Sequence, residues 1–279
     1  MRNDRPLQKL VVGVSDTASE TAVEWVVDRL RTRPAEVTLV SAFDWDVTDW
    51  NEVDRALERV GRTIRAASPE SIVHLGSVDA PAADAIAEAT REAELLVIGS
   101  RRREHLASLT GATALRLAGQ SRCATVIVPE AWSPAPKGLI LVGVDDDSSD
   151  GAVELAAREA EATGARLELV RAWTAPLPAF DPLVWIADTE HALRVDNQEQ
   201  LDAVVERAKA AHPTRHIAGL VREGLPSAAL AARAGDADLV VLGTHRHGVV
   251  IGFLLGSTAQ ELLRNSTTPV CVVPEPAAG

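Results

Sequence analysis

Short apolar runs bounded by turn-forming residues recur along the chain and alternate with segments of helical spacing. Residues 239–242 and 270–273 are two such runs, and runs of this kind are typical of parallel strands buried on both faces. Between the runs, apolar residues recur at intervals of three and four, as Val23, Val26 and Leu30 do. Such intervals predict helices with one buried face. The pattern as a whole predicts an α/β protein in which helices cover a parallel sheet.

The same pattern occurs twice. The run that begins at Leu10 and contains Val14 returns at Leu139, with Val144 in the matching place, and a second strand follows in both halves. Prolines between the halves suit a short, semi-stiff linker. A tandem duplication of a unit of about 140 residues, an ordinary domain size, explains the pattern. The expected division is a first domain at 1–130, a linker at 131–138 and a second domain at 139–279.

Each repeat reads as strand, helix, strand, an irregular stretch with a helix, and then three strands separated by helices. In the irregular stretches, residues 44–50 and 174–185, Trp, Asp and Pro fit neither period and predict surface loops. Helical spacing returns at 53–67 and 191–211. In each domain we expect an open, parallel, five-stranded sheet with helices on both faces, a Rossmann-like fold. Ligands of such sheets bind beyond the carboxyl ends of the strands.

Composition and charge exclude several classes of protein. The chain has 279 residues and a net charge of −12, so a general nucleic-acid or acidic membrane surface is not expected. No apolar run approaches the roughly 20 residues that span a bilayer, and the start lacks a signal peptide, so we expect a cytoplasmic protein. Cys123 and Cys271 form no metal-binding or disulfide pattern, and His245 with His247 lacks further ligands nearby. We therefore expect no metal centre.

One stretch of the second repeat has the features of an anion cradle. Gly243 ends the strand at 239–242, and Gly256 with Ser257 opens the next helix. Glycine permits close backbone approach, and the N–H groups at a helix start favour an anion. These residues indicate a ligand that carries phosphate.

A carboxylate and two valines extend this candidate site. Asp145 follows the first strand of the repeat, and its carboxylate can accept hydrogen bonds from a ribose hydroxyl or an adenine amino group. Val144 and Val170, at the ends of adjacent strands, would form an apolar wall for a base. The ligand expected from these residue types is a nucleotide.

The whole chain resembles a tandem universal stress protein, over both repeats from the first strand to the last. The family's ATP-binding members have an Asp after the first strand, a Val-x-x-Gly-x-Pro turn, and Gly-x-x-Gly followed at a fixed separation by Gly-Ser or Gly-Thr. The second repeat is similar, with Asp145, VREGLP at 221–226, Gly243, and Gly256 followed by Ser257. The resemblance implies an adenine nucleotide alpha hydrolase-like fold and an ATP site. The site residues it implies here are Gly143, Val144, Asp145, Val170, Gly224, Leu242, Gly243, His245, Arg246, Gly256, Ser257 and Thr258.

Arg246 departs from the family pattern, because it stands where the second glycine of Gly-x-x-Gly would be. A side chain at this position can fill the space that phosphates need. A guanidinium is also a good phosphate partner. Whether Arg246 blocks or supports nucleotide binding therefore stays open.

The first repeat matches the motif less well. Ser15 stands in place of the Asp, and Ala112 replaces the hydroxyl residue after the glycine. We expect this domain to be degenerate, mainly structural and without ATP. The run Arg101, Arg102 and Arg103 has two interpretations, a solvated basic turn in an acidic protein or a site for a different phosphate ligand.

The expected function is a cytoplasmic stress-response module that binds ATP in its second domain. Asp146 and Asp147 leave a magnesium ion open as a companion of the phosphates. No nucleophile pattern of a hydrolase is present, so we expect little or slow hydrolysis. The resemblance implies that 125–128 and 270–273 pair within the chain, and it leaves a homodimer open. Two alternatives are a nucleotide-free scaffold or interaction protein and a slow ATPase.

Overall fold

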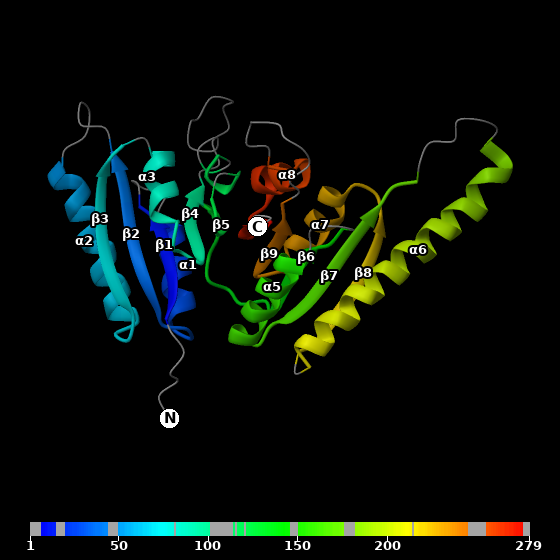
Figure 1. Ribbon diagram of the computed structural model, residues 1–279, viewed down its shortest axis with the longest axis horizontal. Coiled ribbons are helices and arrows are strands. Elements are labelled where there is room, and N and C mark those ends of the chain that lie inside the picture. Colours follow the sequence, from blue (N-terminus) through cyan, green and yellow to red (C-terminus); the bar gives the residue numbers. More distant parts are fainter. Residues whose placement is uncertain are drawn as a thin grey trace. The chain divides into compact units, whose positions relative to one another are not determined.

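The structure is a computed structural model in which strands and helices alternate along the chain (Figure 1). It describes all residues except 1–6, 15–19, 44–49, 81, 101–113, 115, 120, 146–149, 176–181, 214, 245–254 and 276–279. The described residues form two compact units. The first consists chiefly of residues 7–135 with Pro269–Pro274, and the second chiefly of residues 136–244 with Gly256–Thr268.

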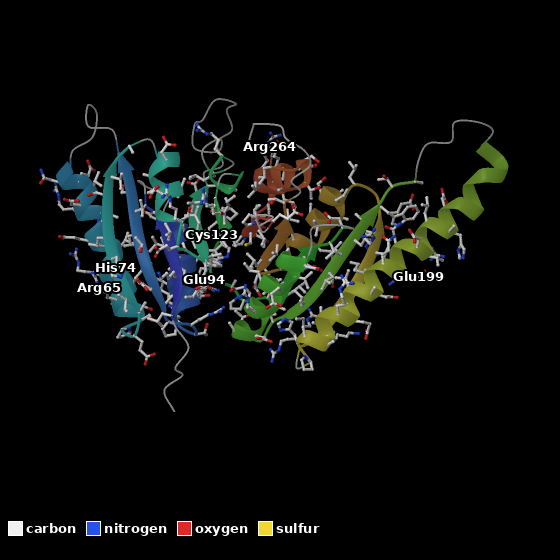
Figure 2. The ribbon with its side chains drawn as sticks, viewed as in Figure 1. Arg65, His74, Glu94, Cys123, Glu199 and Arg264 are labelled. Carbon is white, nitrogen blue, oxygen red and sulfur yellow. The ribbon has the colours of Figure 1, made fainter. Side chains whose placement is uncertain are left out.

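The first unit is built on a largely parallel sheet in the order β3-β2-β1-β4-β5-β10. Helices α1 and α2 pack with each other and against strands, and α3 packs on β1 and β2. At the β3 edge, Arg65 donates to the Val73 carbonyl at 2.9 Å, and His74 lies 3.2 Å from Glu36 (Figure 2). The elements are β1 (Gln8–Gly13), α1 (Glu20–Leu30), β2 (Ala35–Phe43), α2 (Trp50–Ala67), β3 (Ile72–Asp79), α3 (Ala82–Ala89), β4 (Leu95–Ser100), β5 (Ala124–Pro129) and β10 (Val270–Val273).

The last strand of the chain belongs to the sheet of the first unit. Strand β10 runs antiparallel to β5, with Val270 opposite Ile127 and Cys271 opposite Val126. Both strands are buried at these positions. Pairing satisfies backbone groups that an open sheet edge would expose. The expected pairing of 125–128 with 270–273 is therefore observed.

The second unit contains a parallel sheet in the order β9-β6-β7-β8. Arg171 on β7 donates to Asn197 of α6, whereas Glu168 on the same strand accepts from Arg233 of α7. Residues three apart on a strand point to opposite faces, so helices cover both faces of this sheet. The elements are β6 (Leu139–Gly143), α5 (Asp150–Thr163), β7 (Arg166–Trp173), α6 (Pro182–Ala211), β8 (Ile217–Glu223), α7 (Pro226–Ala234), β9 (Leu239–Gly243) and α8 (Ser257–Asn265).

Helix α6 begins earlier than the sequence pattern predicts. The loop expected at 174–185 is wrong in its last part, because the helix begins at Pro182 and the helical spacing was recognised only from 191. Proline is well tolerated in the first turn of a helix. The first turns form a continuous apolar run, LVWI, which hides the three-to-four spacing. None of the described helices combines the length and the apolar character that a bilayer crossing requires.

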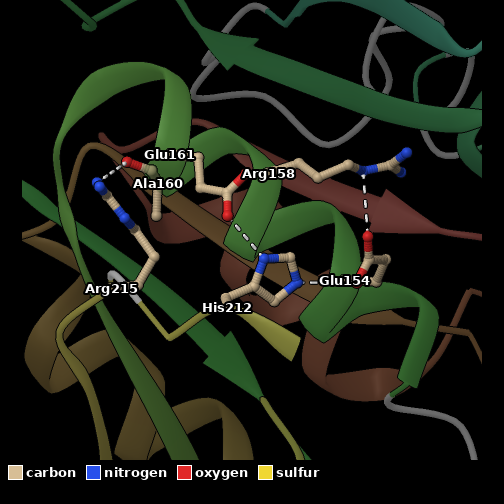
Figure 3. A network of polar contacts seen from close by, with 6 residues as sticks. All are labelled: Glu154, Arg158, Ala160, Glu161, His212 and Arg215. Atoms are coloured by element: carbon tan, nitrogen blue, oxygen red, sulfur yellow. Dashed lines mark hydrogen bonds and ion pairs between the residues drawn. The ribbon is translucent and has the colours of Figure 1, made fainter. Parts of the chain in front are cut away.

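A histidine joins α6 to α5 at the end of α6 (Figure 3). His212 Nδ1 lies 2.8 Å from Glu161 Oε1, and its Nε2 lies 3.0 Å from Glu154 Oε2. A carboxylate can only accept, so both ring nitrogens must carry a proton for both contacts to be hydrogen bonds. Arg158 lies 3.8 Å from Glu154, and Arg215 donates to the Ala160 carbonyl at 3.5 Å. The arrangement favours a charged imidazolium between two carboxylates.

The surroundings of His212 set the direction of its titration. Hydrogen bonds to Glu161 and then to Glu154 raise the pKa of His212 above its ordinary value, and burial opposes them. A histidine whose pKa is higher in the folded state than in the unfolded chain stabilises the fold fully below the unfolded value, about 6.5. This contribution is lost as the pH rises through the raised folded-state pKa.

Replacing His212 with Gln should therefore destabilise the protein in a pH-dependent way. We expect the loss in unfolding free energy to be about 1 kcal/mol near pH 6, because the two carboxylates are partly exposed, and clearly smaller near pH 9. Urea unfolding at the two pH values measures the difference. His216→Gln changes an exposed histidine beside the same turn and is the matched control. A loss for His212→Gln that is equal at both pH values would contradict the imidazolium bridge.

Candidate functional site

The carboxyl ends of β6, β7 and β9 bring several of the predicted site residues together. Gly143 lies opposite Val170 on one side and Leu242 on the other. The backbone N–H of Val144 donates to the Val170 carbonyl at 3.0 Å, which continues the ladder past the end of β6. Val144, Val170 and Leu242 are buried. Asp145, which directly follows Val144 in the chain, is exposed. The exposed carboxylate of Asp145 therefore lies next to the buried apolar residues at the carboxyl ends of these strands.

The turn between β8 and α7 ends at this same side of the sheet. Gly224 has a φ of +120°, a conformation that side chains other than glycine rarely adopt. Its N–H donates to the Trp173 carbonyl at 2.8 Å, which fixes the turn to the end of β7. Leu225 is the N-cap of α7, with 62% of its surface exposed, and Pro226 follows in the first turn. The Val-x-x-Gly-x-Pro motif thus builds a turn and a helix start.

The N-cap of helix α8 is Gly256, which is exposed and extended, with φ −55° and ψ 150°. Ser257 is exposed and Thr258 half-buried, whereas Ala259 and Leu262 anchor the helix in the core. Apart from the two residues adjacent in the chain, no described atom lies within 4 Å of the place that a Cβ on Gly256 would take. The space around this helix start is therefore open among the described residues.

Helices α7 and α8 both begin without a side-chain cap from any described residue. The first turn of a helix has backbone N–H groups without intrahelical partners, and the helix dipole adds positive potential there. Each helix follows a strand of the parallel sheet, so both begin on its carboxyl side, and the two helices pack against each other. Two uncapped helix starts at one edge are suited to bind an anion.

Gly143 has a packing reason of its own. A Cβ at this position would lie 2.8 Å from Leu242 Cδ2 and 3.1 Å from Leu230 Cδ1. The matching glycine of the first unit, Gly13, would lie 3.0 Å from Ile98 Cγ2 in the same way. Close packing against the neighbouring strand and a helix on the sheet, β9 and α7 at Gly143 and β4 and α3 at Gly13, therefore explains this glycine in both repeats. Contact of Gly143 with a ligand stays a prediction.

Some residues named from the sequence lie outside the described part of the chain. These include His245 and Arg246, so the question whether Arg246 blocks or supports binding stays as the sequence left it. In the first repeat they include Ser15, the arginines at 101–103 and Ala112. Gly243, half-buried, ends β9, and the hydroxyl of the next residue, Thr244, accepts from the Glu275 N–H at 3.3 Å.

Two supports of the site were not found from the sequence. Arg171, next to Val170, is buried and donates to Asn197 Oδ1 at 2.8 Å and to Gln200 Oε1, which locks α6 onto β7. Asn197 and Gln200 read as ordinary surface positions of a helix, so nothing in the pattern indicated a buried partner. Leu225 was the second, although Pro226 after it was a signal for a helix start at that turn.

The described residues contain no group of three His, Cys, Asp or Glu side chains that could hold a metal ion. Cys123 and Cys271 are buried, and neither is part of a disulfide. Burial raises the pKa of the Cys123 thiol, although a hydrogen bond with Ser121 opposes the shift. A protonated, buried thiol is a poor nucleophile.

A parallel sheet in which strands and helices alternate and helices cover both faces defines the class of Rossmann-like α/β proteins. A model of the universal stress protein family matches residues 6–129 and, again, residues 138–274. The chain belongs to the universal stress protein family and carries the family's domain twice.

Known relatives show the same tandem arrangement. Universal stress protein Rv2623 of Mycobacterium tuberculosis is 28% identical over 291 residues, which covers 95% of this chain and 96% of the relative. Universal stress protein Rv2005c of the same organism is 27% identical over 304 residues, with 98% and 99% covered. The crystal structure of a universal stress protein from Archaeoglobus fulgidus matches with a TM-score of 0.68 at 17% identity, covering 95% of this chain and 98% of that one. The last likeness supports the fold.

Replacing Gly143 with Ala should destabilise the second unit, because the new methyl group would press on Leu242 and Leu230. We expect a loss of about 1–3 kcal/mol in the free energy of unfolding, the usual effect of overpacking a core. Gly235→Ala is the matched control. Gly235 is in a helical conformation with φ −59° and open space around it, so its replacement should be neutral or stabilise by up to about 1 kcal/mol. Urea unfolding of both variants checks this, and equal effects would contradict the packing role.

Proposed function

We propose that this universal stress protein binds an adenine nucleotide, ATP, at the carboxyl edge of the sheet in its second unit. The observation that carries the proposal is the pair of uncapped helix starts, at α7 and α8, on the edge where Asp145 follows β6. An apolar strand end, a carboxylate and free N–H groups match the three parts of a nucleotide, which are base, ribose and phosphates.

Each described residue has a distinct part in the proposed complex. The side chains of Val144 and Val170 contact the base, and the Asp145 carboxylate accepts hydrogen bonds from the ribose hydroxyls. Gly224 shapes the turn beside them. The N–H groups of Ser257 and Thr258 donate to phosphate oxygens, and the open space at Gly256 lets the phosphates approach. The family resemblance implies that Leu242, Gly243, His245 and Arg246 line the phosphate side, where a Mg²⁺ ion would neutralise part of the charge.

The proposed role is regulatory. The site combines groups that hold a nucleotide, and the sequence supplies no hydrolase nucleophile pattern. Binding of ATP would stabilise one conformation of the second unit, which a partner in the cytoplasm recognises, and hydrolysis would be slow. Binding can shift a conformational equilibrium only through a difference in affinity between the two conformations.

Calorimetric titration of the full chain with ATP tests the proposal. We expect saturable binding to the wild type, and a loss of about tenfold or more for Asp145→Ala, since hydrogen bonds to a charged group contribute roughly 1.5–3 kcal/mol. Asp54→Ala removes an exposed carboxylate from α2 in the first unit and should leave the affinity unchanged.

Two other results would favour the alternatives. No detectable binding of ATP to the wild type would reject the proposal and favour a nucleotide-free scaffold or interaction protein. Magnesium-dependent turnover that is lost in Ser257→Ala would identify a slow ATPase instead of a regulatory binding module.

A further inference from the structure

A hollow of about 410 Å³ opens in the first unit, at the amino ends of β1 and β2. Lys9, Leu10 and Val11 of β1 and Glu36 and Thr38 of β2 line it, with Lys9 opposite Glu36 and Val11 opposite Thr38 in register. The end of α3 and the turn after it, residues 88–93, form the rest of its wall. This volume lies within the range of small-molecule pockets, roughly 300–1,000 Å³.

The corresponding place in the second unit is filled by an ion pair. Val11 of the first repeat matches Leu141 of the second. Val11 pairs with Thr38 and Leu141 pairs with Glu168, so Glu168 is the equivalent of Thr38. Arg233 of α7 donates from Nε and Nη2 to the two carboxylate oxygens of Glu168, at 3.1 and 3.0 Å. A guanidinium held by both oxygens of a carboxylate is a strong and geometrically specific contact.

The first unit lacks both members of this pair. Leu10 and Ile140 are matching residues of the two repeats. Leu10 pairs with Leu95 and Ile140 pairs with Leu239, so Leu95 and Leu239 are equivalent. Counting back along the chain, Ala89 is then the equivalent of Arg233. Short side chains at Thr38 and Ala89 thus stand where Glu168 and Arg233 fill the space. The hollow of the first unit thus lies at the position where the second unit has a guanidinium–carboxylate pair.

The charges around the hollow favour a cation. Helix α3 has no basic residue in its last turn, whereas α7 has Arg233 there, and the end of a helix attracts positive charge. The cations of the wall already face carboxylates, with Lys9 at 3.2 Å from Glu92 and Arg91 at 2.7 Å from Glu88.

Glu36 is the remaining carboxylate of the lining. Its side chain is 35% exposed, and it lies 3.2 Å from His74 Nε2, a group that is charged only when protonated. Glu36 is two residues before Thr38 on β2, so both side chains point to the same face of the sheet. The carboxylate and the Thr38 hydroxyl can therefore accept hydrogen bonds from one ligand.

We propose that this hollow binds the guanidinium group of a small organic cation. The planar guanidinium donates to the Glu36 carboxylate and to the Thr38 hydroxyl, and the end of α3 adds negative potential above it. The ligand takes the place that the Arg233 side chain occupies in the second unit. The proposed nucleotide site belongs to the second unit and lies at the carboxyl ends of its strands, so it shares no residue with this hollow.

Amide chemical shifts of the full chain test the site, with N-ethylguanidinium as the probe and N-ethylurea as its uncharged isostere. We expect saturable shifts at Lys9, Glu36 and Thr38 with the cation and no such shifts with the urea. Absence of saturable shifts at millimolar probe, or equal shifts with the urea, would overturn the proposal.

Variants that fill the hollow, or that remove the negative charge of Glu36, make the test specific. Thr38→Glu combined with Ala89→Arg builds the ion pair of the second unit into the first and should abolish probe binding. Glu36→Gln should weaken it by about tenfold or more, and it decides the matter if the double variant fails to fold. Glu199→Gln removes the same charge from α6 (Figure 2) and should leave binding unchanged. Unaltered binding in Glu36→Gln would contradict the proposal.

Discussion

Burial of a parallel sheet on both faces is the constraint on which the rest of this structure depends. Strands such as β6 and β9 are buried along nearly their whole length, and helices cover both faces of the sheet. Strands pair their backbone groups within the sheet, whereas the ends of strands and helices carry backbone groups without such partners. Asp145, the Gly224 turn and the Gly256 helix start all lie at such ends. The position of the candidate site is thus a consequence of the packing.

Duplication gave the chain two copies of this frame, and side chains at equivalent positions have since diverged. Gly13 and Gly143 are retained in both repeats, because in each a helix and a strand pack against them. Glu168 with Arg233 in the second unit corresponds to Thr38 with Ala89 in the first, where the space has opened. The two ligands that we propose for the two copies differ accordingly in their chemistry.

Most of the fold could be predicted from the sequence, because periodicity reports which residues are buried. The apolar runs located the strands, and the resemblance led to the pairing of 125–128 with 270–273 that β10 and β5 show. The start of α6 was missed, since a continuous apolar run carries no helical period. Bridges such as His212 with Glu154 and Arg171 with Asn197 were also missed. The two residues of each bridge are far apart in sequence, and a contact between two different elements leaves no local sequence pattern. The candidate site residues came from motif and resemblance, and their contact with a ligand remains a prediction.

Amide hydrogen exchange of the full chain with and without saturating ATP tests the central claim most directly. Amides in the first turns of α7 and α8 lack intrahelical partners, so they should exchange rapidly in the free protein. The account predicts that ATP slows exchange at Ser257 and Thr258 and around Gly224, while β3 in the first unit is unaffected. ATP binding that leaves the exchange of these helix starts unchanged would contradict it.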